Sequence, residues 1–195
     1  MDIEIRNGVA TITGYVNAVE RESRVLYDFQ GEFVEVVNAN TFRSALESNP
    51  NVGLMFNHVR DVDHMDMTLI EDNIGLKATV LVTDLEVINK AIAGELRGWS
   101  FGFYCNKSDW DIRKDGMRIR RISDIYLEEV SILDCTPAYV GTSIEMRGED
   151  SKLIERRINN EVPTVTELDD PTADTDAIIS NLQMKKRKFY FDLLK

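Results

Sequence analysis

Short apolar runs recur along the first 146 residues and predict strands. Residues 8–16 are rich in β-branched side chains, residues 32–37 alternate charged and apolar positions, and residues 52–56 form a compact apolar run. Further strands are predicted at 67–71, 75–82, 99–104, 117–122 and 125–133. The first two of these are expected to form a hairpin that turns at Asp72 and Asn73.

Two helices are predicted between these strands. Asn40 can cap a short helix that ends at Asn49-Pro50, and Thr83 or Asp84 can cap a second one. The second helix has apolar residues at helical spacing, namely Val87, Ile88, Ala91, Ile92 and Leu96. Many strands with only two helices indicate an α+β fold, a mostly antiparallel, closed β-barrel surrounded by a few helices.

The character of the chain changes after Arg147, so residues 1–147 are predicted to be the barrel domain. Residues 151–158 can form a short helix, and residues 161–176 are acidic, contain two prolines and are expected to be a flexible linker. Residues 177–195 return to helical spacing and carry a basic cluster. This last segment is either a detachable docking segment or a helix that packs on the domain or frays.

Composition and charge exclude several classes of function. The chain has 195 residues and 34 acidic against 23 basic side chains, a net charge of -11, which disfavours binding to a nucleic-acid backbone. We find no secretory signal and no apolar run near the roughly 20 residues that span a bilayer. Cys105 and Cys135 lack CxxC spacing, which favours two buried thiols in a reducing compartment. With only two histidines besides, a structural zinc site lacks ligands.

His58 and Ser100 are the candidates for acid–base and nucleophilic chemistry. His58 follows the apolar run that ends at Phe56, where a core strand would hold an imidazole rigidly at the solvent edge. Ser100 lies between aromatic residues in Gly98-Trp99-Ser100-Phe101-Gly102, and the glycines leave room for close approach of a backbone. A histidine that caps a strand and a buried strand serine remain alternatives. His64 lies among aspartates and is expected at the surface.

Glu128 and Glu129 are the candidates for an acidic partner of the histidine. Strand alternation turns one of them inward, where a carboxylate needs a hydrogen bond such as the one an imidazole N–H can donate. Glu129 shares its side of the strand with Ser131, and Glu128 shares its side with Val130. Alternation alone does not choose between them, and an exposed charge pair at a sheet edge is the other interpretation.

The order of these segments resembles the prohead protease family of tailed phages over residues 8–146. The matching segments are Gly14-Tyr15, Glu35-Val36-Val37, Thr41-Phe42, Leu54-Met55-Phe56-Asn57-His58, Gly75-Leu76-Lys77-Ala78, Trp99-Ser100-Phe101-Gly102-Phe103, Leu127-Glu128-Glu129-Val130-Ser131 and Thr136-Pro137-Ala138-Tyr139. The resemblance implies a barrel related to herpesvirus assemblin. It also implies His58 as general base, Ser100 as nucleophile and Glu129 as third member of a triad.

The resemblance further implies a serine endopeptidase that works in the host cytoplasm inside the assembling procapsid. Its substrates would be the phage major capsid protein, its scaffolding segment and the enzyme itself. From the charge, the apolar runs and the ligand count above, we expect no cofactor, metal, nucleic acid or membrane. A homo-oligomer is left open. The loop from Asp134 to Thr142 has no arginine, so backbone N–H groups near it are expected to form the oxyanion hole.

Two other kinds of protein compete with this interpretation. One is a catalytically inactive scaffold or capsid-assembly protein on the same barrel. The other is a small barrel that binds a ligand or peptide, with Trp99, Phe101 and Phe103 as its lining. A structure that shows whether Ser100 faces His58 separates the enzyme from the binding barrel.

Overall fold

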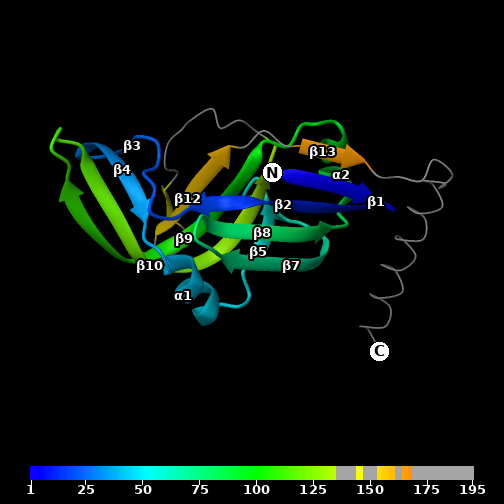
Figure 1. Ribbon diagram of the computed structural model, residues 1–195, viewed down its shortest axis with the longest axis horizontal. Coiled ribbons are helices and arrows are strands. Elements are labelled where there is room, and N and C mark those ends of the chain that lie inside the picture. Colours follow the sequence, from blue (N-terminus) through cyan, green and yellow to red (C-terminus); the bar gives the residue numbers. More distant parts are fainter. Residues whose placement is uncertain (135–143, 147–152, 161–163, 168–195) are drawn as a thin grey trace.

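A computed structural model describes residues 1–134, 144–146, 153–160 and 164–167, which form two β-sheets and two helices (Figure 1). The first sheet has five strands, and two of its four strand pairings join segments that are far apart in the sequence. In spatial order the strands are β13 (Thr164–Glu167), β1 (Asp2–Arg6), β2 (Val9–Ala18), β8 (Gly75–Val82) and β7 (His64–Glu71). The β7–β8 hairpin predicted from the sequence is confirmed.

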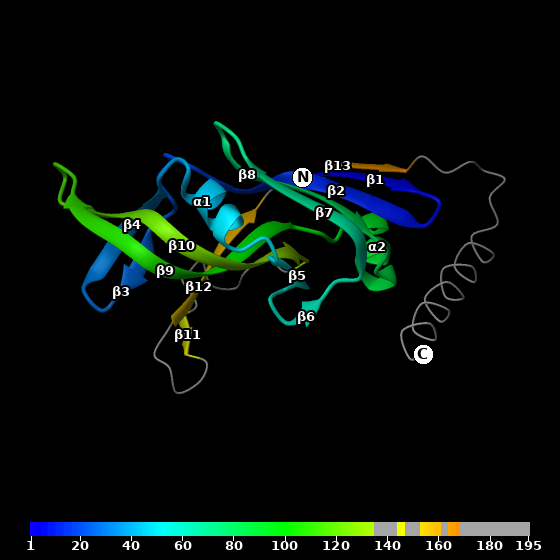
Figure 2. The same ribbon diagram turned by 90° about the horizontal axis from the view of Figure 1, so that it is seen from below.

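The second sheet has eight strands and is organised by the long strands β9 and β10. Its main path is β11 (Ile144–Met146), β12 (Leu153–Asn160), β9 (Gly98–Ile112), β10 (Arg118–Leu133), β4 (Gly31–Val37) and β3 (Leu26–Asp28). Off this path, β5 (Gly53–Phe56) pairs with β10, and β6 (Arg60–Asp61) pairs with β5. Figure 2 shows β3 and β4 at one end of the long strands and β5 and β6 at the other.

The fold is mostly β, but the predicted closed barrel is wrong. Within the described residues the end strands of each sheet do not pair with each other, so both sheets remain open. The end strands β3 and β11 have only three residues each, too few to close a barrel around strands of 15 and 16 residues. The pairing is also not purely antiparallel, because β10 runs parallel to both β4 and β5.

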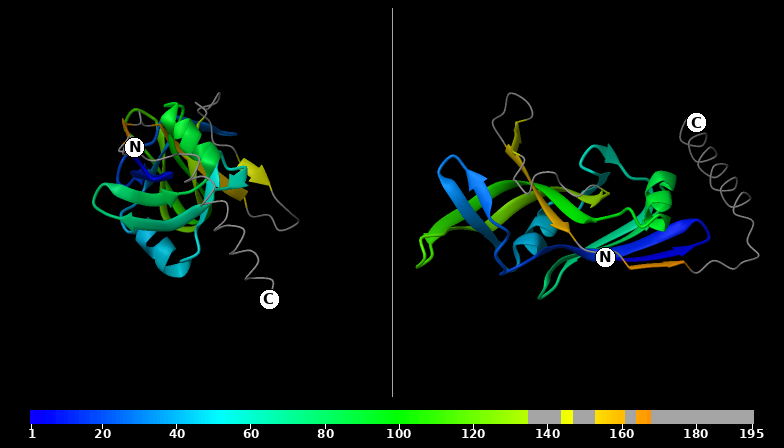
Figure 3. Two further views of the ribbon diagram at one scale, coloured as in Figure 1. Left: turned by 90° about the vertical axis from the view of Figure 1, so that its right-hand side faces the viewer. Right: turned by 90° about the horizontal axis from the view of Figure 1, so that it is seen from above.

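The two helices form where the sequence predicts them and lie on opposite sides of the molecule (Figure 3). Helix α1 spans Thr41–Ser48 and α2 spans Leu85–Ile92. Asp84 caps α2 as expected, accepting hydrogen bonds from the backbone N–H groups of Glu86 and Val87.

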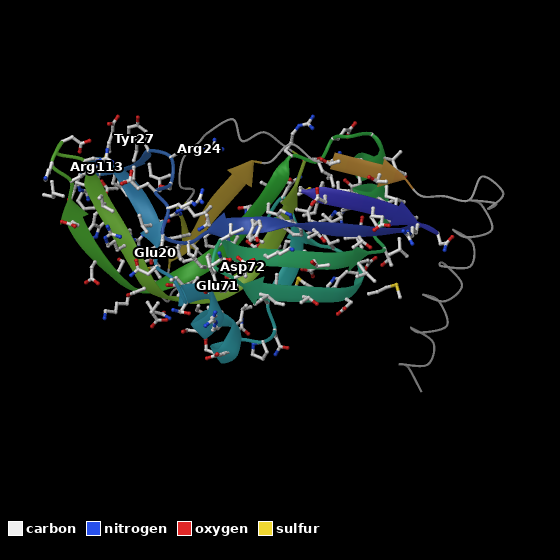
Figure 4. All side chains as sticks on the ribbon, viewed as in Figure 1. Glu20, Arg24, Tyr27, Glu71, Asp72 and Arg113 are labelled. Carbon is white, nitrogen blue, oxygen red and sulfur yellow. The ribbon has the colours of Figure 1, made fainter. Side chains whose placement is uncertain are left out.

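The cap of α1 differs from the prediction. The side chain of Asn40 makes no capping hydrogen bond; instead the Glu71 carboxylate at the end of β7 accepts from the N–H groups of Asn40 and Arg43. Figure 4 labels Glu71 beside this helix. A carboxylate at a helix N-terminus also favours the helix dipole. The cap therefore comes from a distant strand, which neighbouring sequence cannot reveal.

Three segments differ from the sequence prediction in length or type. The strands expected at 117–122 and 125–133 are one strand, β10, which stays continuous through irregular pairing near Asp124. Residues 151–158 were expected to be helical, whereas β12 is a strand along β9. The expected linker contains β13, which pairs in parallel with β1. The predicted segment 177–195 lies outside the described residues.

The aromatic side chains near Ser100 belong to the core shared by the two sheets. Trp99, Phe101 and Phe103 are fully buried. Phe101 contacts Phe42 of α1 edge-on and stacks against Phe103. These rings fill the interior, so they do not line a ligand pocket as one of the alternatives required.

Candidate active site

His58 lies on a tight turn at the end of β5. Asn57 and His58 both adopt the left-handed conformation, with φ of 53° and 60°. This conformation is unfavourable for residues other than glycine, although asparagine tolerates it well. The N–H of His58 donates to the hydroxyl of Ser131 on β10, at 3.0 Å. The turn therefore holds the imidazole against the neighbouring strand.

Asn57 ties the same turn to the end of β10. Its amide donates to Asp134 Oδ1 at 2.7 Å, and the backbone N–H of Asp134 donates back to Asn57 Oδ1 at 3.2 Å. Lys90 of α2 forms an ion pair with the other carboxylate oxygen, at 2.8 Å. Partial burial raises the pKa of Asp134, but the bonds from Lys90 and Asn57 outweigh it, so that the pKa is lowered overall. The Asp134 carboxylate therefore stays ionised at neutral pH, and it clamps the turn through Asn57.

Glu129 of β10 lies between β5 and β9. Its register partners are Gly53 on β5 and Gly102 on β9. A methyl group at position 102 would collide with Glu129 Oε1, whereas one at position 53 would make an ordinary contact with Glu129 Cβ, at 3.6 Å. Gly102 thus provides the space that the carboxylate fills. From the sequence, this glycine was expected to leave room for close approach of a backbone.

Ser100, His58 and Glu129 lie in one hydrogen-bonded line. His58 Nε2 is 2.6 Å from Ser100 Oγ, and His58 Nδ1 is 2.6 Å from Glu129 Oε1. The His58 and Glu129 side chains are 10% and 6% exposed, so solvent hardly competes for these contacts. Serine and histidine are 42 positions apart along the chain, and β10 brings their strands together. The arrangement can pass a proton from a hydroxyl to an imidazole that a carboxylate orients.

Strand β12 covers Ser100. The serine has no exposed surface, and its Oγ donates a hydrogen bond to the backbone carbonyl of Arg157, at 2.6 Å. The register partner of Ser100 on β12 is Ile158. In this arrangement the hydroxyl touches a peptide carbonyl of the same chain.

The other candidate residues lie elsewhere or take no part in this line. Glu128 is half-buried and Glu129 is the one that contacts the histidine. His64 is exposed, and its Nδ1 lies 2.8 Å from the Val62 carbonyl. Cys105 is a half-buried free thiol, and its burial raises its pKa. Cys135 and most of the loop expected to supply the oxyanion hole lie outside the described residues.

Comparison with known families places the chain in a class of enzyme. The family model of the caudovirus prohead serine protease matches residues 1–157. The chain belongs to this family. The matched range contains Ser100, His58 and Glu129, and it also contains Arg157 at its end.

The prohead protease is therefore a serine endopeptidase of phage capsid maturation, acting on capsid or scaffold proteins in the assembling procapsid. Searches of curated proteins and of solved structures return no match. In the part of the chain that the structure describes, no helix is both long and apolar enough to cross a membrane.

Sequence reasoning missed the residues that hold the turn of His58 in the candidate site. The Ser131 hydroxyl accepts a hydrogen bond from the N–H of His58, and the hydrogen bonds between Asn57 and Asp134 hold the turn. Ser131 lies two positions after Glu129, so alternation placed it on the correct face, but nothing in the sequence named its partner. The pair Asn57-His58 offered one usable signal, since asparagine is common where φ is positive.

Proposed function

We propose that Ser100 is the nucleophile of this prohead protease, that His58 is its general base and that Glu129 orients the imidazole. The observation that carries the proposal is the continuous line from Ser100 Oγ through both ring nitrogens of His58 to Glu129 Oε1, each contact 2.6 Å long. Ser100 and Glu129 come from β9 and β10 and His58 comes from the turn after β5, and burial restricts all three side chains to one geometry.

The reaction follows from these contacts as ordinary acyl transfer. His58 takes the hydroxyl proton as Ser100 Oγ attacks a substrate peptide carbonyl, and it then gives that proton to the leaving amine. Water repeats the cycle on the acyl-enzyme and regenerates the serine. The Glu129 carboxylate accepts the Nδ1–H and stabilises the imidazolium that forms between the two proton transfers.

The substrates we propose are the major capsid protein, its scaffolding segment and the protease itself, cleaved in the procapsid within the host cytoplasm. The acidic segment 161–176 is the proposed site of self-cleavage, and residues 177–195, which carry Lys185, Lys186, Arg187 and Lys188, would dock on the scaffold. Mass spectrometry of the enzyme after capsid maturation tests this: a chain that remains intact would contradict self-trimming.

The catalytic assignment is tested by Ser100→Ala and His58→Ala in a capsid-protein processing assay. Each substitution is expected to reduce cleavage by a factor of about 10⁴ or more, because the nucleophile and its base act as one unit. A fluorophosphonate probe should label Ser100 and no other serine. Arg118→Ala, which removes an ion pair to Asp28 on the outer part of the sheet, is the matched control. Processing at the control rate by either variant would remove that residue from the mechanism.

A further inference from the structure

We propose, building on the proposed function, that the edge of β9 beside Ser100 is the binding site for an extended peptide strand. Strand β12 occupies that site in this structure and keeps the enzyme latent. The ligand is a strand with an acidic residue two positions before an arginine, as in Glu155-Arg156-Arg157.

The first support is the position of the nucleophile on the sheet. Along one side β9 pairs with β10, and along the other side the described residues give it only β12, from Gly98 to Tyr104. Without β12, Ser100 would lie on an edge strand with unpaired backbone N–H and C=O groups. Edge strands of this kind bind extended peptides by adding a strand to the sheet.

The second support is that the Ser100 hydroxyl has two possible hydrogen-bond acceptors but only one proton. The hydroxyl has one proton, yet Oγ lies 2.6 Å from both His58 Nε2 and the Arg157 carbonyl oxygen. If the proton goes to the carbonyl, Nε2 must donate to Oγ, and Nε2 then has no free lone pair with which to accept the serine proton. If the proton goes to the histidine, the carbonyl oxygen faces the lone pairs of Oγ without a hydrogen bond. The docked β12 is therefore incompatible with a serine that is ready to attack.

The third support is the way β12 is anchored. Arg157 donates to both oxygens of the buried Glu35 carboxylate, at 2.6 Å each, and to Glu155 at 2.7 Å. Arg120 donates to Glu155 Oε1 at 2.8 Å. Burial lowers the pKa of the Arg157 guanidinium, but its carboxylate partners outweigh burial and the pKa is raised.

This anchor defines the chemistry of the ligand. The body of the protein contributes one acid, Glu35 of β4, and one base, Arg120 of β10. Strand β12 contributes the complementary pair, Glu155 and Arg157, on one face of the strand, where both are buried. Main-chain pairing along β9 would give a peptide affinity, and the two charges would select its sequence.

The first test measures how fast a fluorophosphonate labels Ser100 in three forms of the full chain. Arg157→Ala should release β12 and raise the rate by about tenfold or more, as expected when a minor competent state becomes the main one. Arg118→Ala, which also loses a guanidinium paired with a carboxylate, should label at the wild-type rate. Equal or slower labelling of folded Arg157→Ala, with folding followed by circular dichroism, would overturn the proposal.

A milder variant covers the case in which Arg157→Ala does not fold. Glu155→Gln keeps the volume of the side chain and removes its charge from the ion pairs with Arg120 and Arg157. It should raise the labelling rate by a smaller factor than Arg157→Ala. A folded Glu155→Gln protein that labels no faster than wild type would contradict latency.

The second test measures binding without catalysis, in a Ser100→Ala background. Fluorescein-labelled peptide Leu-Ile-Glu-Arg-Arg-Ile-Asn-Asn, the sequence of β12, should raise fluorescence anisotropy with the Arg157→Ala variant and not with the parent. The same peptide with glutamine in place of the glutamate and the second arginine is the control and should bind at least about tenfold more weakly. Equal binding of the two peptides, or no binding, would overturn the strand site.

The two tests separate this inference from the proposed function. If the probe labels no form of the protein while the peptide binds, Ser100 is not a nucleophile and the strand site stands. If the probe labels wild type and Arg157→Ala at the same rate, the nucleophile stands and latency fails.

Discussion

Two groups of buried charged side chains lie on opposite faces of the sheet around β9, and they differ in their hydrogen bonds. On one face, Glu129 contacts a single histidine, and its Oε2 has no hydrogen-bond partner among the described residues. On the other face, Glu35 and Glu155 have arginine partners on all four carboxylate oxygens. A cluster with every oxygen paired fixes a geometry. A carboxylate that bonds only one imidazole leaves that imidazole free to change protonation, as acyl transfer requires.

The most direct way to break this comparison is Glu129→Gln. An amide can still accept from His58 Nδ1–H but no longer stabilises an imidazolium, so kcat should fall by about 10²–10⁴-fold while the melting temperature changes little. Steady-state cleavage of a capsid-protein substrate measures it. Glu128→Gln, one position away and half-buried, is the matched control and should stay close to wild type. A larger loss with Glu128→Gln would mean that the wrong glutamate is assigned.

Glu35→Gln tests whether the arginine–glutamate cluster on the other face contributes to stability and not to catalysis. It leaves the Arg157 guanidinium buried with one fewer carboxylate, so the free energy of unfolding should fall by about 3–5 kcal/mol. Urea unfolding followed by circular dichroism measures the change. The labelling rate of Ser100 in the folded fraction should not fall. A loss of reactivity without a loss of stability would place Glu35 in the chemistry and remove the contrast between the two faces.

Gly102→Ala sharpens the comparison because it acts on the carboxylate without touching any charge. The added methyl group would collide with Glu129 Oε1, so the carboxylate must move and kcat should fall by about 10²-fold. Gly53→Ala adds the same group on the other side of Glu129, where the contact is ordinary. Cleavage rates of the pair should therefore differ clearly, and similar rates would show that the carboxylate tolerates displacement.

Asn57→Ala should have the smallest effect. It removes the clamp to Asp134 and places alanine at positive φ, which together cost about 1–3 kcal/mol of stability. We expect cleavage to slow by about tenfold because His58 is held less well. Asn57→Gly removes the same side chain but suits the backbone, so comparison of the two thermal melts separates strain from the lost hydrogen bonds. Identical melts would show that backbone conformation is unimportant at this turn.

The positions of the strands near the site could be predicted from the sequence better than the pairing between them. Alternation and apolar runs predicted β4, β5, β8 and the start of β9. Strands β5 and β8 have a buried face that a period of two reveals, whereas most of β4 and the start of β9 are continuous buried runs. The pattern divided β10 at Ser123 and Asp124, where the polar residues accompany irregular pairing with β9. It also predicted a helix where β12 forms, because the free edge of β9 and the buried partner Glu35 are remote in sequence.

The same limit applies to the candidate site. His58 was identifiable because the chain has only two histidines, and Ser100 because glycines and aromatic residues flank it. The family resemblance pointed to the same two residues. Alternation could not decide between Glu128 and Glu129, since the pairing of β10 with β9 is irregular between Leu127 and Glu129 and the strand is buried on both faces from Glu129 onward; the contact with His58 distinguishes them. Ser100 is buried by β12, whose Arg157 lies 57 positions farther along the chain, and no local sequence pattern predicts this contact.

The central place of β10 has a consequence for when activity can arise during synthesis. Strands β5 and β9 carry the turn of His58 and the serine, but both precede β10 and pair with it. A nascent chain that has not yet emerged through Leu133 lacks the strand that aligns them. Strand β10 also carries Glu129, so the hydrogen-bonded line of the site cannot form until synthesis has passed this strand.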